Sequence, residues 1–138
     1  MLALPALLST RWLIIGLAAF IGKQFVADFL LQNQWMAFGK ERAKGWIAPL
    51  IAHAGVHAAL TAVIFTLLGP SLAWLAVVDF VVHLAIDRAK GVIGRRFGLT
   101  TKSTYFWWLL GFDQLLHHAT HAMFVVMLAA LRSAPELG

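Results

Sequence analysis

Four long apolar segments divide the chain. They cover residues 11–32, 46–68, 71–90 and 104–131. Each has about 20 residues or more, the length that an α-helix needs to cross a hydrocarbon core of roughly 30 Å. None shows the alternation of a membrane β-strand, and only helices and closed barrels satisfy their backbone in lipid. The pattern predicts an all-α polytopic membrane protein, a bundle of four transmembrane helices.

Glycine and proline mark the connections between these segments. Gly69 and Pro70 predict a very tight turn between the second and third helices. Loops around residues 39–45 and 91–103 join the other pairs. We expect one membrane domain over residues 1–138, in which the apolar residues 1–9 lead into the first helix and are not a cleaved signal peptide.

Composition and charge support a membrane location. Hydrophobic residues make up 61% and charged residues 12% of the chain, against about 45–50% and about 25% in a soluble domain. Eight of the eleven lysines and arginines lie in or beside the first and third connections. The positive-inside rule therefore predicts a bacterial inner (cytoplasmic) membrane protein, with both basic connections in the cytoplasm and both termini outside.

The same features limit the partners. The chain has no basic run interleaved with solvent-facing aromatic residues, so the lipid bilayer is an expected partner and nucleic acid is not. Homo-oligomerisation stays open. Cysteine is absent, which excludes disulfides, a thiol nucleophile and a cysteine-based zinc site.

The polar residues within the predicted spans form a pattern. All six histidines and four of the six acidic residues lie there, although a carboxylate at the centre of a span costs about 2.5–3.5 kcal/mol on insertion scales. Residues four apart share one face of a helix. Such stripes comprise Gln24, Asp28 and Gln32; His53 and His57; Asp79, His83 and Asp87; and Asp113, His117 and His121. We expect most of these groups to meet in one layer of the bundle core, nearer the cytoplasmic side.

Imidazole and carboxylate are the usual metal ligands where cysteine is missing. The predicted metal ligands are Asp28, His53, His57, His83, Asp87, Asp113 and His117. This number of ligands fits two ions, or one ion with separate acid or base residues, and zinc is preferred to iron or manganese. The predicted catalytic residues are Asp28, Lys90 and Gln114. Asp28 would act as a general base, Lys90 would contact an anionic group of the substrate, and Gln114 would donate or accept hydrogen bonds.

Other polar residues have simpler interpretations. His118 points away from the face of Asp113 and His117, which favours a packing role. His121 and Asp79 lie deeper, where a mutual hydrogen bond and metal ligation are equally good explanations. Lys23 is either a snorkelling residue or a counter-charge.

Four short blocks carry a resemblance to a known family. DFLLQ (28–32), HAGVH (53–57), HLAIDRAK (83–90) and DQLLHH (113–118) resemble signature blocks of small bacterial and phage integral membrane proteins, the family called domain of unknown function 3307. The resemblance covers nearly the whole chain and implies a membrane protein whose polar residues matter, without implying an activity. The HxxxD form of HLAID is also similar to a motif of membrane-bound metal-dependent hydrolases.

Together these observations predict a metal-dependent hydrolase that acts on a lipid or phospholipid-like substrate near the cytoplasmic face. Two alternatives stay open. A di-iron membrane oxidase or hydroxylase is suggested by HHATH and HAGVH, which loosely resemble histidine boxes. A proton or divalent-cation transporter is suggested by the intramembrane chain of Asp and His residues.

Overall fold

The computed structural model describes residues 7–137, with side chains through residue 134. Within that range the chain is all-helical and has no β-strand. Its elements are α1 (Thr10–Phe25), the π-helix η1 (Val26–Leu31), α2 (Gln34–Gly39), α3 (Ile47–Leu68), the 3-10 helix η2 (Pro70–Leu72), α4 (Leu75–Arg96) and α5 (Thr104–Leu137). Most of residues 1–9, expected to lead into the first helix, lies outside the described residues.

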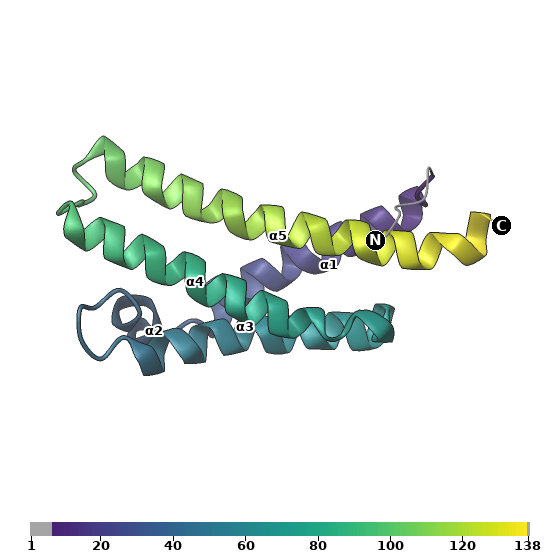
Figure 1. Cartoon of the computed structure of the whole chain (residues 1–138), viewed down its shortest axis with the longest axis horizontal. Coiled ribbons are helices and arrows are strands. Elements are labelled where there is room, and N and C mark those ends of the chain that lie inside the picture. The colour runs from purple at the N-terminus through teal and green to yellow at the C-terminus, as the bar shows by residue number, and fades with distance from the viewer. Residues whose placement is uncertain (1–6, 138) are drawn as a thin grey trace.

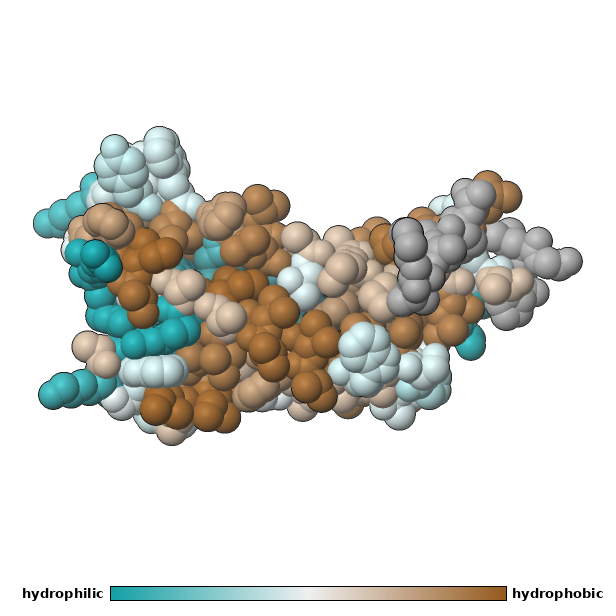
Figure 2. Space-filling view, viewed as in Figure 1, coloured by the Kyte–Doolittle hydropathy of each residue, from teal (hydrophilic) through white to brown (hydrophobic). Residues whose placement is uncertain are grey.

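Among the described residues, four helical segments are long and apolar enough to cross a membrane, as predicted. They are Thr10–Leu31, Ile47–Leu68, Pro70–Arg96 and Thr104–Ala134. Large apolar side chains such as Phe29, Val77 and Leu115 project outward from them. Hydrophobic residues cover the middle of the molecule, and hydrophilic residues gather at the end that holds α2 (Figure 2).

The helices form an elongated bundle in which α3, α4 and α5 run lengthwise and α1 crosses them at an angle (Figure 1). Helix α4 packs against both α3 and α5, and α1 packs against α5 and α3. The described ends of the chain lie at one end of the bundle, and α2 and the α4–α5 connection lie at the other. The tight turn predicted at Gly69 and Pro70 joins α3 to α4.

The two halves of the bundle have different cores. The half nearer the termini is filled by an apolar cluster that includes Phe20, Phe65 and Phe124, whose ring centroids lie 5.7–5.9 Å apart. The ring of His121 lies 5.3 Å from that of Phe20 and marks where the polar core begins. The half nearer α2 holds the histidines and aspartates of the candidate site.

The predicted loop over residues 91–103 is wrong at its start. Helix α4 continues through Gly91 and Gly94 to Arg96, and its capping turn contains Gly98 at φ 58°. An interior glycine costs a helix only about 1 kcal/mol, and tertiary packing offsets this at Gly91, where a Cβ would lie 3.4 Å from the Cα of Glu41. The last helix likewise runs six residues beyond its predicted end at residue 131.

Helix α2 was not predicted. Asn33 caps it, because its side chain accepts a hydrogen bond of 2.9 Å from the backbone N–H of Met36. Gly39 then packs directly on α3, where a Cβ would lie 2.5 Å from Cγ of Pro49. The following residue, Lys40, is buried in the bundle.

Candidate metal centre

The seven predicted metal ligands converge on one region of the bundle. Asp28 comes from η1, His53 and His57 from α3, His83 and Asp87 from α4, and Asp113 and His117 from α5. All except His57 line a cavity of about 470 Å³. The polar stripes with i, i+4 spacing therefore face one another in the folded chain, and four separate segments contribute residues to one site.

The histidines lie ring against ring. The ring centroid of His83 is 3.9 Å from that of His57, 4.1 Å from that of His117 and 5.0 Å from that of His53. Candidate ligand atoms of His53, His57 and His83 lie within 4.8 Å of one another, and so do those of His83, Asp87 and His117. His83 belongs to both groups and is the geometric centre of the site.

Asp87 is the most highly connected carboxylate. Its Oδ2 lies 2.8 Å from Nζ of Lys40 and 3.5 Å from Nε2 of His53, and its Oδ1 lies 3.3 Å from Nε2 of His117. The Lys40 ammonium therefore supplies a positive charge to the carboxylate at the centre of the cluster. Both side chains are buried, so this is an ion pair largely removed from solvent.

Asp28 lies on the π-helix η1, an arrangement that is rare and recurs at functional sites. The Nε2 of Gln24 donates to Oδ2 of Asp28 over 2.6 Å, and the Nε2 of Gln32 donates to its backbone carbonyl over 3.2 Å. Its other oxygen, Oδ1, lies 3.0 Å from Nε2 of His57 and 3.6 Å from Nε2 of His53. The predicted polar stripe of the first span thus holds one carboxylate beside the histidines.

Several buried polar atoms of the site lack hydrogen-bond partners. Both ring nitrogens of His83 are in this state, and so are Nδ1 of His53, Nδ1 of His57 and Oδ1 of Asp113. A buried donor or acceptor without a partner costs about 1–3 kcal/mol, and native structures contain few of them. A cation coordinated by these groups would satisfy several at once. The donor set, histidine nitrogen with carboxylate oxygen, suits zinc, iron or manganese.

Lys90 and Gln114, the two residues predicted to contact substrate, line the same cavity. The Nζ of Lys90 is 3.0 Å from Oε1 of Glu41 and 3.9 Å from Oδ2 of Asp113. The Nε2 of Gln114 donates to Oδ2 of Asp113 over 3.0 Å. Arg88, the residue after Asp87, stacks over Trp46, with Cζ 3.8 Å from the ring centroid.

A second polar cluster separates the site from the aromatic core. The Nζ of Lys23 lies 2.7 Å from Oδ2 of Asp79 and 2.9 Å from Nε2 of His121. Thr61 donates to the same oxygen of Asp79 over 2.5 Å. Lys23 is thus a counter-charge and not a snorkelling residue, and Asp79 and His121 are engaged with each other and with Lys23. His118, for which the sequence favours a packing role, is exposed on the outer face of the bundle.

Lys40 is the main participant that the sequence did not identify. Its position in a basic connection is typical of a topology signal, and nothing in its spacing links it to the stripes of polar residues. The available signals were Asn33, a strong helix N-cap, and Gly39 directly before the lysine. They indicate a short helix whose end packs closely, although they do not reveal its partner.

The family model described as "Protein of unknown function (DUF3307)" matches residues 17–136. The matched range includes every residue of the candidate metal centre. Comparisons with curated proteins and with solved structures gave no match.

Proposed function

The chain belongs to this family, and from its site we propose that it is a membrane-embedded, metal-dependent hydrolase acting on a lipid or phospholipid-like substrate. The carrying observation is His83, which is buried at the centre of two candidate ligand groups with neither ring nitrogen hydrogen-bonded. An imidazole in that state is destabilising unless something coordinates it. Because there are two candidate ligand groups that share His83, the site would hold one or two divalent ions.

The side chains around the histidines support hydrolysis. A divalent cation, when bound, supplies Lewis-acid polarisation and a nucleophilic water at neutral pH. Asp28, fixed by Gln24 beside His57, is placed to accept a proton. Lys90, which lines the cavity, supplies a positive charge for an anionic substrate group, and Gln114 orients Asp113.

We place the site near the cytoplasmic face of a bacterial inner membrane. The basic residues of the α2–α3 and α4–α5 connections lie at the same end of the bundle as the cavity, and the positive-inside rule assigns that end to the cytoplasm. A periplasm-dependent reporter enzyme fused after the C-terminus should then be active. The same reporter inserted in the 97–103 connection should be inactive, and the reverse pattern would contradict this orientation.

The activity is tested with long-chain p-nitrophenyl esters and phosphodiesters in mixed micelles. We expect metal-dependent release of p-nitrophenol that a chelator abolishes and added zinc, manganese or iron restores. His83→Phe should remove it, and His118→Phe, which alters an exposed histidine of α5, should not. Hydrolysis that persists in His83→Phe or in chelator would refute the proposal.

The second polar cluster favours one alternative function. Lys23, Asp79 and His121 extend the polar core toward the other end of the bundle, as a proton or cation transporter would require. Ion flux in proteoliposomes that is lost in Asp113→Asn, without any hydrolysis, would favour transport. Bound iron with an oxygen-dependent product would favour the di-iron oxidase alternative.

A further inference from the structure

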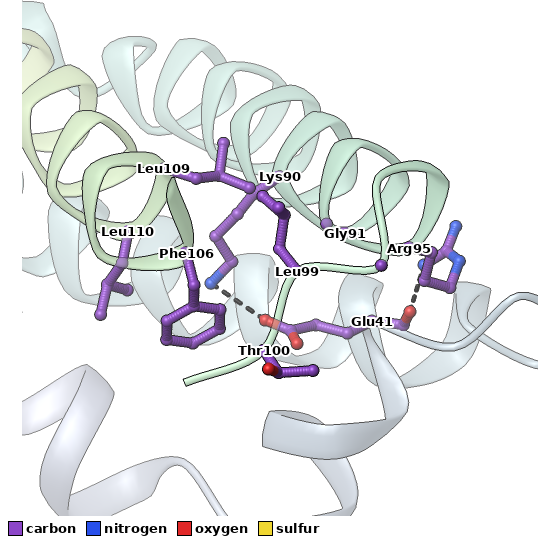
Figure 3. A pocket seen from close by; sticks show the side chains of 11 residues that line it. Glu41, Lys90, Gly91, Arg95, Leu99, Thr100, Phe106, Leu109 and Leu110 are labelled. Carbon is purple, nitrogen blue, oxygen red and sulfur yellow. Dashed lines mark hydrogen bonds and ion pairs between the residues drawn. The ribbon is translucent and has the colours of Figure 1, made fainter. Parts of the chain in front are cut away.

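A second cavity adjoins the metal centre at the α2 end of the bundle. It has a volume of about 340 Å³ and lies between the last turns of α4 and the first turns of α5. Its apolar walls come from Leu99, Phe106, Leu109 and Leu110 (Figure 3). This volume is within the range of about 300–1,000 Å³ that is usual for small-molecule sites.

The two cavities meet at a charged junction. Glu41, Lys90 and Leu110 line both of them. At the junction Lys90 forms its 3.0 Å ion pair with Glu41, and the Arg95 guanidinium donates to the backbone carbonyl of Glu41 (Figure 3). An apolar cavity therefore adjoins a polar one beside two cationic side chains. Among the described residues, Lys90 is paired with a carboxylate, whereas Arg95 bonds to a backbone carbonyl.

We propose that the second cavity binds the apolar chain of a single-chain anionic amphiphile whose head group replaces the Glu41 carboxylate at Lys90. The lining of the cavities matches the polarity of such a molecule along its length. Leucine and phenylalanine side chains would surround its apolar chain, and Lys90 would contact its head group. The head group then lies in the larger cavity. Asp113 is also near this position, since its Oδ2 is 3.9 Å from Nζ of Lys90. The inference rests on the proposed function, because it names the substrate class of that site.

Glycines in and just after α4 leave space on one side of the second cavity. Gly94 and Gly98 contribute to its wall. A Cβ at Gly94 would make ordinary contact with Leu109, at 3.9 Å from Cδ2. A leucine there fits the helix and places its remaining carbons in the cavity. Gly94→Leu is therefore a variant that fills the cavity without altering any charged group.

The test uses diazirine-bearing dodecyl phosphate as a photoaffinity probe on the full-length protein in lipid nanodiscs, with labelled peptides mapped by mass spectrometry. We expect saturable labelling between Leu99 and Leu110 that unlabelled dodecyl phosphate competes and inorganic phosphate does not. Gly94→Leu should weaken binding at least about tenfold, the change expected when two methylene groups lose their contacts. Gly111→Leu is the matched control, because that α5 glycine is exposed with nothing within 4 Å of a Cβ.

Further measurements distinguish the contribution of the head group from that of the apolar chain of the probe. Glu41→Gln should strengthen labelling by the dodecyl phosphate probe, since it frees Lys90, and leave labelling by a diazirine-bearing dodecanol unchanged. The same probe with a carboxylate head distinguishes a fatty acid from a phosphate amphiphile, and either anion binding better than dodecanol supports the proposal. Equal labelling by dodecanol and the anions, or labelling that Gly94→Leu does not reduce, would overturn it.

This experiment fails independently of the proposed function. Labelling is measured in protein treated with chelator and in protein supplied with zinc, and neither hydrolysis nor bound metal is needed to observe it. A protein that binds metal but shows no saturable labelling contradicts the inference alone. Saturable labelling in a protein that binds no metal contradicts the proposed function alone.

Discussion

Replacing His83 with phenylalanine should change stability in opposite directions with and without metal. The side chain is 1% exposed, and both of its ring nitrogens lack hydrogen-bond partners. Phenylalanine keeps a ring between those of His57 and His117, at 3.9 and 4.1 Å, and removes the unpaired donor and acceptor. Each of the two unpaired ring nitrogens costs about 1–3 kcal/mol, and fitting the larger phenylalanine ring takes back about 1–3 kcal/mol. The metal-free variant should therefore be more stable than the metal-free wild type by about 1–3 kcal/mol.

With metal the order should reverse. A ligand at 100 times its dissociation constant stabilises the folded state by about 2.7 kcal/mol, and only the wild type should gain this. The assay is equilibrium unfolding by SDS from mixed micelles, followed by circular dichroism, in chelator and in zinc. His118→Phe controls for the loss of a histidine. A metal-free His83→Phe protein less stable than the metal-free wild type, or a zinc effect equal in both, would refute the reasoning.

Two further predictions concern the groups around the site. Lys23→Met should destabilise the protein by about 3–5 kcal/mol in the same SDS titration, because it leaves the buried Asp79 carboxylate without the Lys23 ammonium. The double variant Lys23→Met, Asp79→Asn should recover much of that loss. An undiminished loss in the double variant would contradict the ion-pair explanation. Gly39→Val should displace α2, since a Cβ would lie 2.5 Å from a proline carbon of α3. Lys40 should then react faster with an amine-labelling reagent detected by mass spectrometry, whereas Gly55→Val, with open space around its Cβ, should leave the rate unchanged.

Much of the architecture follows from local features of the sequence. Span length and hydropathy predicted four helices because lipid leaves the backbone few other options. The polar stripes predicted which faces meet, since an Asp or His facing lipid is costly and burying it against other polar groups is the available solution. Asp87 and His117, 30 residues apart, illustrate this, because each lies on the expected face and their side chains meet at 3.3 Å.

The unpredicted features depend on tertiary contacts. Gly91 weakens a helix by about 1 kcal/mol, and its close approach to Glu41 in another segment, a contact that the sequence does not reveal, fits the continuation of α4 past it. Lys40 has the sequence context of a topology signal, yet α2 brings it to Asp87. The ion pair of Glu41 with Lys90 likewise joins residues 49 positions apart without a repeat or motif. Such pairings depend on where a short helix folds back, which one sequence does not encode in its periodicity.

Elemental analysis of the purified protein shows directly whether the Asp and His cluster binds metal. The metal-to-protein ratio is measured by mass spectrometry after dialysis without chelator, for the wild type, His83→Phe and His118→Phe. We expect one or two zinc, iron or manganese ions per chain in the wild type and in His118→Phe, and a clear loss in His83→Phe. A wild-type protein with no stoichiometric metal, even after incubation with each ion, would contradict it.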